Sequence, residues 1–462
     1  MWSYGFAMRT GRALAALIAL TVSTWFAVAA EASATQYGYL SGFNSGEISA
    51  GKLLPDGGFD PVAGSPFAPG AARLQGIAVS PDGKLVFAAD EDDDEVEALA
   101  VGSNGALSDA PGSPRPVGDQ PVGVAPTPNG KFVYVSGGDA IAGFKVGAGG
   151  AISPTFQASI DNPEGPQGIA ISADGKRLFT ANGNSNVSSY RIAKDGTLTE
   201  VSGSPFGSLF IPYALVVSRD GRHLYVADRE QPTSAVHGFT VGSNGSLTEL
   251  DDSPWSTGGG NAFSLALSPD GDYVYAGNYE SDSLAAFHVM PDATLTPLAG
   301  SPYAATDSPS AITFDAAGEH LFLNGGSGPL QTWSIGSGGV PDSPLLNLFG
   351  EAGDFQSIAL TPAQPPKAKL KAKRNGLKVK FDASKSTDDG PIAQYDWKFG
   401  DGGKTTTQKP RATWRYEKKG RYEVSVRATD RDRCSTKYRS GGQTPYCNGG
   451  KQAVATKTVK VK

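Results

Sequence analysis

A short phrase of apolar and turn-forming residues returns seven times along this chain of 462 residues. The copies begin at residues 76, 123, 168, 214, 264, 311 and 357, so the intervals are 47, 45, 46, 50, 47 and 46 residues. The third copy reads GIAISADGKRLFTAN, and the last one, SIALTP, stops halfway. An interval of this size is typical of one supersecondary unit per repeat, stacked on its neighbours.

Each repeat contains four strand signals separated by turns. In the third copy they are residues 168–172, 176–182, 186–192 and 198–206, and Gly175 supplies the positive φ of the first turn. The third signal alternates apolar and polar residues, and the fourth is more polar than the others. Four antiparallel strands per repeat predict the blades of a propeller, because the coils of a β-helix are shorter.

The truncated last copy has a counterpart near the start of the chain. Residues 36–67 lack a first strand but otherwise match the third copy, including a shared Gly-Ser-Pro-Phe at residues 64–67 and 203–206. We expect residues 357–362 to supply the missing inner strand. This closure predicts a seven-bladed β-propeller over residues 35–362, with no open edge.

The N-terminal residues have the pattern of an export signal. Arg9 and Arg12 precede an uncharged apolar run at 13–30, and Ala-Ser-Ala at 32–34 offers small residues for cleavage. We expect residues 1–34 to be a signal peptide, which makes the mature protein secreted or bound to the cell surface. The alternative is an uncleaved membrane anchor, because the run has 18 residues. No transmembrane span is expected after cleavage.

The two cysteines, Cys434 and Cys447, both lie near the C-terminus. In an exported protein we expect them to form a disulfide, which would stabilise this region by about 3 kcal/mol through loop closure. A zinc site needs about four ligands and finds none nearby. A catalytic thiol is disfavoured because no histidine follows position 320.

The net charge of −6 hides an asymmetry between two parts of the chain. Residues 366–462 carry 25 Lys and Arg against 9 Asp and Glu, which gives +16. Residues 35–365 carry 13 against 36, which gives −23. A field of this size can recruit anionic polymers or draw the two parts together, and salt-sensitive separation of the parts would support the second alternative.

A Pro-rich linker at 363–366 precedes the basic part, residues 367–462. This part contains Phe381-Asp-Ala-Ser, Phe399-Gly-Asp-Gly and Val424-Ser-Val, and it resembles the PKD domain. That resemblance implies an immunoglobulin-like β-sandwich of a kind common in extracellular proteins. An insert at 431–450, which holds both cysteines, departs from the usual pattern.

Several residues of this domain allow two interpretations. Trp397 and Trp414 are expected in the core rather than in a sugar-stacking role, and Asp388-Asp389 is expected to form a turn rather than a Ca²⁺ site. A lysine row either protects an edge strand or meets an anionic partner, and it comprises Lys367, Lys369, Lys371 and Lys373. Nucleic acid is not expected as a partner, because neither a recognition helix nor aromatic–basic interleaving is present.

The strands KFVYVSG, RHLYVAD and DYVYAGN, each after a turn like SPDG, resemble the YVTN-type and lactonase-like seven-bladed propellers. The resemblance covers residues 36–362 and extends to the 6-phosphogluconolactonases. It implies the fold more than the chemistry, because the repeated residues are those that build turns and blades. A propeller of this type before a PKD domain is also similar to some archaeal surface-layer proteins.

One face of the propeller should carry the varied residues that precede inner strands or follow second strands. Their amides, rings and guanidinium groups suit hydrogen bonding to a sugar or peptide, although Asn and Asp could instead cap loops. The ligand-binding candidates are Arg73, Gln75, Gln120, Gln167, Tyr213, Asp228, Arg229, Asn261, Asn278, Tyr279, Glu280 and Gln356.

An acidic loop, Glu91 to Glu95, follows the first repeat. It could hold a divalent cation, meet the basic domain or remain solvated, and its spacing is not that of an EF-hand. No other cofactor is expected.

Catalysis has weak support in the sequence. Lactone hydrolysis needs a base and a group that stabilises the oxyanion. None of the four histidines falls among the varied residues expected on the binding face, around the mouth of the central channel. Glu280 or Asp228 could serve as a base. A phosphorylated substrate would need clustered cations, and only Arg73 and Arg229 are available.

We expect a monomeric, exported binding or structural protein that recognises an envelope polysaccharide or protein. In this view the PKD domain is a spacer or an anchor to anionic polymers. The alternative is a lactonase-like hydrolase that acts on an extracellular small molecule.

Overall fold

The computed structural model describes residues 35–153, 159–161, 164–229, 234–305, 308–326, 328–347, 355–441 and 444–462. The expected signal peptide, residues 1–34, lies outside the described residues. Within them, no helix has the length and apolar character needed to cross a membrane.

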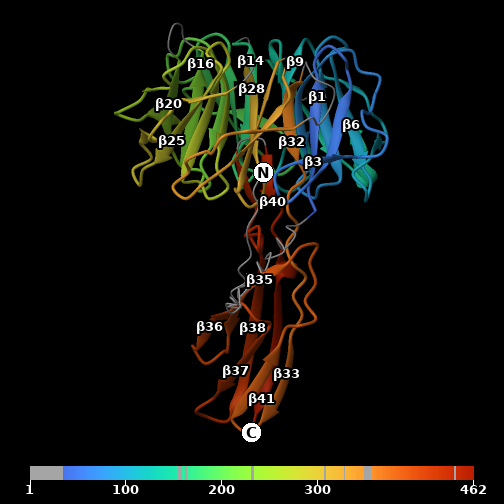
Figure 1. The fold of residues 1–462 in the computed structure, drawn as a ribbon, viewed down its shortest axis with the longest axis vertical. Helices are drawn as coiled ribbons and strands as arrows, with labels where there is room; N and C mark the ends of the chain where they lie inside the picture. Colours follow the sequence, from blue (N-terminus) through green and yellow to red (C-terminus); the bar gives the residue numbers. More distant parts are fainter. Residues whose placement is uncertain are drawn as a thin grey trace, which may run out of the picture. The chain divides into compact units, whose positions relative to one another are not determined.

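Seven antiparallel sheets form the blades of the propeller (Figure 1). The first combines β1 (Tyr37–Gly42), β2 (Ile48–Leu53) and β3 (Phe59–Pro61) with β32 (Phe355–Leu360). The second holds β4 (Leu74–Val79), β5 (Leu85–Asp90), β6 (Glu95–Val101), β7 (Leu107–Asp109) and β8 (Arg115–Pro116). The third holds β9 (Pro121–Pro126), β10 (Phe132–Gly137), β11 (Ala140–Val146), β12 (Ile152–Ser153) and β13 (Ser159–Asp161), with a 3₁₀ turn at Ala148–Gly150.

The other four blades repeat this order. The fourth holds β14 (Pro166–Ile171), β15 (Arg177–Asn182), β16 (Asn186–Ile192) and β17 (Leu198–Glu200). The fifth holds β18 (Pro212–Val217), β19 (His223–Asp228), β20 (Ala235–Val241), β21 (Leu247–Glu249) and β22 (Trp255–Ser256). The sixth holds β23 (Ala262–Leu267), β24 (Tyr273–Asn278), β25 (Ser283–Val289), β26 (Leu295–Pro297) and β27 (Tyr303–Ala304). The seventh holds β28 (Pro309–Phe314), β29 (His320–Gly325), β30 (Leu330–Ser334) and β31 (Leu345–Asn347).

The ring closes through the first and last strands of the propeller. β32 pairs with β1 in antiparallel register, with Leu40 opposite Ile358. Each inner strand contacts the next around the axis, and β28 contacts β32, which contacts β4. The closure expected from the truncated repeat is therefore present, and it leaves no inner strand unpaired at the seam.

Neighbouring blades are joined by packing and by a repeated hydrogen bond. Buried aliphatic and aromatic residues of adjacent sheets form shared clusters, such as Ile48 of β2 with Val86 of β5. A tyrosine on the second strand of a blade donates to a carbonyl in a turn of the next blade. The donors Tyr39, Tyr134, Tyr225 and Tyr275 reach the oxygens of Gly105, Gly196, Ala293 and Gly339 at 3.0, 2.5, 2.9 and 2.5 Å. The tyrosine that recurs on these strands thus makes an inter-blade contact.

The C-terminal domain is a β-sandwich. One sheet holds β33 (Lys371–Asn375), β34 (Lys378–Asp382) and β37 (Arg411–Arg415). The other holds β35 (Ile392–Lys398), β36 (Lys404–Thr407), β38 (Gly420–Asp430) and β41 (Val454–Val461), the last preceded by a 3₁₀ turn at Lys451–Ala453. Trp397 is buried between the sheets with Phe381 and Phe399, as expected. Trp414 is half-buried and stacks on Phe399 with ring centroids 4.3 Å apart.

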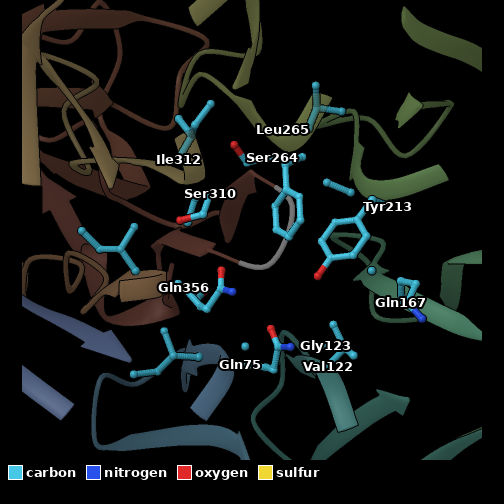
Figure 2. A pocket seen from close by; sticks show the side chains of 18 of the residues that line it. Gln75, Val122, Gly123, Gln167, Tyr213, Ser264, Leu265, Ser310, Ile312 and Gln356 are labelled. Carbon is cyan, nitrogen blue, oxygen red and sulfur yellow. The ribbon is translucent and has the colours of Figure 1, made fainter. Parts of the chain in front are cut away.

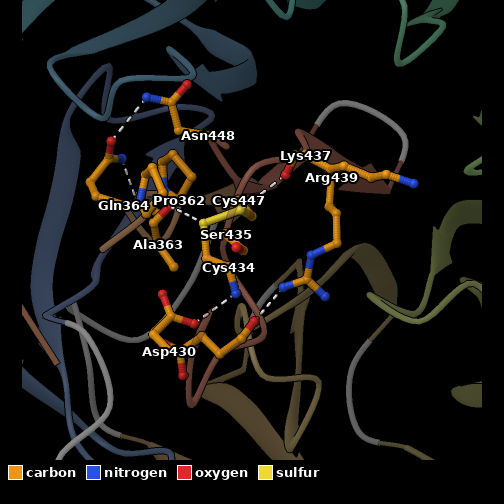
Figure 3. Close-up of a disulfide and its surroundings, with 12 residues drawn as sticks. Pro362, Ala363, Gln364, Asp430, Cys434, Ser435, Lys437, Arg439, Cys447 and Asn448 are labelled. Atoms are coloured by element: carbon orange, nitrogen blue, oxygen red, sulfur yellow. Dashed lines mark hydrogen bonds between the residues drawn. A yellow bond between two sulfur atoms is a disulfide. The ribbon is translucent and has the colours of Figure 1, made fainter. Parts of the chain in front are cut away.

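The insert of this domain packs against the propeller. Its strands β39 (Arg439–Gly441) and β40 (Thr444–Cys447) form a hairpin, and Cys434 forms the expected disulfide with Cys447 (Figure 3). Tyr446 is 1% exposed, packs on Phe314 of β28, and donates its hydroxyl to the oxygen of Leu267 at 2.9 Å. β40 also contacts β4 and β32. Leu267 and Phe314 are the last residues of the inner strands β23 and β28. The hairpin therefore covers the end of the propeller's central channel at which the inner strands finish.

Candidate functional site

A cavity of about 130 Å³ lies where the seven inner strands begin (Figure 2). In every blade the second residue of the inner strand lines it, and these residues are Gln75, Val122, Gln167, Tyr213, Phe263, Ser310 and Gln356. Figure 2 shows Gln75, Gln356 and the hydroxyl of Tyr213 directed toward its centre. We call this set the mouth ring.

The mouth ring arises from a local irregularity in each blade. The register between the first and second strands shifts at this slot in all seven sheets, for example between Pro212 and Ala214. Such a bulge re-aims the side chain that it contains. Three blades have Gly directly after the slot, and at Gly168 a Cβ atom would lie 2.2 Å from the oxygen of Tyr213. Glycine there lets neighbouring inner strands approach closely.

An aromatic and cationic cluster forms one side of the mouth. Phe263 packs between Tyr213 and Tyr279, with centroid distances of 4.1 and 5.3 Å. The guanidinium carbon of Arg229 lies 4.8 Å from the Phe263 centroid, within cation–π range. Arg229 Nε donates to Asn261 Oδ1 at 2.6 Å, and Asn261 donates in turn to Glu280 at 3.3 Å. Five residues that the sequence predicted for the site therefore belong to one connected cluster. They are Tyr213, Arg229, Asn261, Tyr279 and Glu280.

The hydroxyl of Tyr213 remains protonated at neutral pH. Burial raises the pKa of Tyr213 to about 12, and the nearby charge of Arg229 opposes this shift only in part. The hydroxyl can therefore donate a hydrogen bond to a ligand in the cavity.

A second polar cluster lies at the start of β4. Gln75 Nε2 donates to Glu91 Oε2 at 2.8 Å, so a carboxylate stands directly beside a mouth-ring residue. Arg73 Nη1 lies 3.8 Å from Glu91 and 3.1 Å from Asp92, and its guanidinium stacks over Phe43. This cluster brings a carboxylate, a guanidinium and an amide to the edge of the cavity.

Two sequence-predicted residues are buried inside blades instead. Asp228 is 1% exposed and Asn278 is 0% exposed, and neither lines the cavity. Asp228 accepts hydrogen bonds from the amides of Phe210 and Ile211 at 2.6 and 2.7 Å. Burial by itself would raise the pKa of Asp228, but hydrogen bonds from His237 and these amides hold it below its usual value. Asp228 thus fixes the segment that leads into β18.

Gln120 also lies outside the cavity. Gln120 is exposed and has a φ of 45°. Its backbone N–H donates to Asp94 Oδ1 at 2.8 Å. The slot of the third blade is occupied by Val122, two residues later, which the sequence analysis did not select. Gln167 and Gln356, which the sequence also predicted for the site, both line the cavity.

The acidic loop 91–95 is engaged in protein contacts at Glu91, as described above, and also at Asp92 and Asp94. Asp92 pairs with Arg73, and Asp94 accepts the amide of Gln120. Among the described residues, no group of three or more His, Cys, Asp or Glu is arranged to hold a metal ion.

His237 links two carboxylates within the fifth blade. Its Nε2 lies 3.3 Å from Asp228 and its Nδ1 lies 2.7 Å from Glu249. Burial alone would lower the pKa of His237, but hydrogen bonds to Asp228 and Glu249 raise it above its usual value. A raised histidine pKa stabilises the fold fully below about pH 6.5, and this contribution is lost as pH rises through the folded pKa.

We therefore predict that His237→Gln flattens the pH dependence of stability. The wild-type protein should lose stability from about pH 6.5 upward, and the variant should lose less over the same range. Urea unfolding at a series of pH values measures this difference. Parallel curves for the two proteins would contradict the assignment of His237 as a titrating contributor.

The family model described as "Lactonase, 7-bladed beta-propeller" matches residues 77–209 and 208–320, more than half of the chain. This chain belongs to that family. A PKD domain model matches residues 363–441, which include most of the C-terminal β-sandwich.

Solved structures agree with this assignment at the level of the fold. Each of three propellers aligns with 71% of this lactonase-family chain at a TM-score of 0.60. Two are putative 6-phosphogluconolactonases from Bacteroides uniformis and Bacteroides fragilis, at 18% and 20% identity, with 100% and 98% of those chains covered. The third is the periplasmic gluconolactonase PpgL of Pseudomonas aeruginosa, at 19% identity with 99% covered.

Curated relatives match only a short part of the chain. Collagenase ColA of Clostridium perfringens is 42% identical over 69 residues, and the metalloprotease PrtV of Vibrio cholerae is 40% identical over 65 residues. The chain covers 6% and 7% of these proteins. Because each match covers so small a share of both proteins, the activities of these proteases are not transferred to this chain.

Proposed function

We propose that the propeller binds a sugar lactone, or the sugar acid formed from it, in the mouth cavity. The observation that carries this proposal is the composition of the mouth ring, which joins two aromatic rings to three glutamines and a serine. A sugar ring presents C–H groups to aromatic faces and hydroxyls to amides, so it needs this combination. The family and the names of the gluconolactonase neighbours support the same ligand class.

Arg229 extends this site toward the acidic end of such a ligand. A guanidinium offers paired donors to a carboxylate or a lactone carbonyl, and Arg229 is held against Phe263 and Asn261. Since the two arginines of the mouth, Arg73 and Arg229, belong to separate clusters, the site favours an unphosphorylated ligand.

Hydrolysis of the bound lactone is a second candidate, and the Glu91 cluster favours it. In this reaction Glu91 takes a proton from water, the water oxygen bonds to the lactone carbonyl carbon, and Arg73 stabilises the oxyanion. The ring C–O bond then breaks, and the proton passes from Glu91 to the departing ring oxygen. The product is the open-chain hydroxy acid.

The two candidates are tested by separate measurements on the same variants. We expect calorimetry to show binding of gluconate, and we expect Phe263→Ala to weaken it about 10-fold, because one stacked ring contributes about 0.5–1.5 kcal/mol. Tyr303→Ala, at the outer edge of the sixth blade, is the matched control and should bind normally. If hydrolysis occurs, Glu91→Gln should slow it about 100-fold or more in a pH-stat with D-glucono-1,5-lactone, and leave gluconate binding largely intact.

Absence of gluconate binding together with hydrolysis no faster than in buffer would overturn both candidates. Binding that is equal in the Phe263→Ala and wild-type proteins would overturn the placement of the ligand in the mouth.

The basic domain completes the proposed function. We infer that the protein acts outside the cell, where its disulfide is stable, and that the C-terminal domain anchors the propeller to anionic polymers. The charge of +16 over residues 366–462 supports this role.

A further inference from the structure

One face of the sandwich carries the positive charge of the C-terminal domain in an ordered array. The sheet β33–β34–β37 turns alternate residues outward, and the register places Lys373 beside Lys380 and Lys378 beside Arg415. Residues between them, such as Val379 and Phe381, point into the core. The outward cations, all exposed, are Lys371, Lys373, Lys378, Lys380, Arg411 and Arg415, and we call them the basic face.

The basic face is almost without acidic residues. Asp382 is the one acidic residue among the outward positions of these three strands, and it pairs with Arg411 at 3.5 Å. Among the described residues, the other five cations make no ion pair with a carboxylate. Lys367 and Lys369 continue the same row before β33 and are also exposed. Side chains two apart on a strand are separated by about 6.6 Å, and neighbouring strands by about 4.8 Å, so the charges form a dense grid.

The outward positions of the second sheet mix charges of both signs. Asp396 of β35 pairs with Arg427 of β38 at 2.8 Å, and Glu423 adds another acidic side chain to that surface. The second sheet also carries outward cations, with Lys398 beside Lys404 and Arg421 beside Lys460. The excess of cations over carboxylates is nevertheless greater on the basic face, where Asp382 is the single outward acidic residue.

Protection of a sheet edge does not account for this pattern. Lysines on an edge strand such as β33 discourage pairing with other chains. β34, however, lies between β33 and β37, and it carries Lys378 and Lys380 on the same face. A central strand needs no such protection, so these two lysines need another explanation.

We propose that the basic face binds a linear acidic polysaccharide, whose repeated carboxylates lie along the rows of lysines. This inference rests on the anchoring role proposed above and assigns that role to one surface. The outward residues of β33, β34 and β37 include no aromatic side chain, so the face lacks the stacking platforms of single-stranded nucleic-acid sites. Its binding free energy comes from release of counterions, and it falls as salt increases.

The test compares two full-length variants with equal net charge. One replaces Lys371, Lys373, Lys378 and Lys380 of the basic face by Gln. The control replaces Lys398, Lys404, Lys451 and Lys460, which are exposed elsewhere on the domain. Binding to polygalacturonate is measured from about 50 to 200 mM salt, with single-stranded poly(dT) as the competing polymer and gluconate as a probe of the mouth.

We expect the basic-face variant to bind polygalacturonate at least about 10-fold more weakly at the lowest salt, with a shallower salt dependence. The control should stay within about threefold of wild type, because its lysines lie outside the basic face. Equal losses in the two variants, no binding by the wild-type protein, or tighter binding of poly(dT) would each overturn the proposal. Gluconate binding should be the same in all three proteins, so failure of the basic face is distinguishable from failure of the mouth.

Discussion

Replacement of Tyr446 by alanine is expected to lower the free energy of unfolding by about 3–4 kcal/mol, as for other large buried aromatic residues. Tyr446 belongs to the insert of the C-terminal domain, yet its ring is buried among residues of the sixth and seventh blades. Its hydroxyl also satisfies the carbonyl of Leu267, which ends an inner strand. The substitution therefore removes the largest side chain of the hairpin from the base of the channel, and thermal or urea unfolding measures the loss.

Tyr446→Phe is the matched control. It keeps the ring contact with Phe314 and loses only the hydroxyl, so it should cost about 1 kcal/mol. If alanine and phenylalanine at this position have the same effect, the ring does not pack into the propeller and the description of the hairpin as a cover is wrong.

Asp228→Ala is expected to destabilise the propeller by about 3 kcal/mol or more, because it leaves buried partners of a charge unsatisfied. The amides of Phe210 and Ile211 lose their acceptor, and His237 loses one of its two carboxylates. Asp228→Asn keeps an acceptor oxygen at the same place and should cost clearly less. Chemical unfolding of the two variants measures this difference.

The adjacent residue provides the contrasting control. Arg229→Ala removes a half-buried side chain at the mouth, so it should change stability by about 1 kcal/mol or less while weakening gluconate binding. Normal stability of Asp228→Ala together with lost gluconate binding would show that Asp228 serves the ligand rather than the blade.

The propeller could be predicted in outline because each repeat contains recognisable local patterns of turns and strands. The half-repeat at 357–362 lacked three strands and residues 36–67 lacked one, so the pairing of β32 with β1 followed from the requirement for closed blades. The β-sandwich of the C-terminal part was predicted from its resemblance to the PKD domain, which Phe399-Gly-Asp-Gly helps to carry, and a PKD domain model matches residues 363–441. The turns and strands of a repeat depend on neighbours in the sequence, whereas the closure was predictable because the two incomplete repeats complement each other.

The mouth was only partly predictable, because it depends on register. A shift of one residue turns a side chain to the other surface, and the bulge at each inner strand decides which residue faces the axis. Val122 therefore occupies the slot near which the sequence suggested Gln120. Asp228 and Arg229 are adjacent, yet one is buried in a blade and the other lies at the mouth.

The docking of the insert had no signal in the sequence. Two cysteines indicated a disulfide, but nothing near Tyr446 showed that its ring would pack between blades of another domain. The charge asymmetry was visible as a total of +16, whereas the array of cations across β33, β34 and β37 could be recognised only from the pairing of the strands.

A crystal structure of the protein soaked with gluconate would show whether the mouth ring binds a sugar lactone or sugar acid. We predict a sugar acid in the cavity, with its carbon chain against Phe263, its hydroxyls hydrogen-bonded to Gln75, Gln167 or Gln356, and its carboxylate toward Arg229. Gluconate bound at another surface, or an empty mouth at a concentration that saturates binding in solution, would show that the mouth ring is not the sugar-binding site.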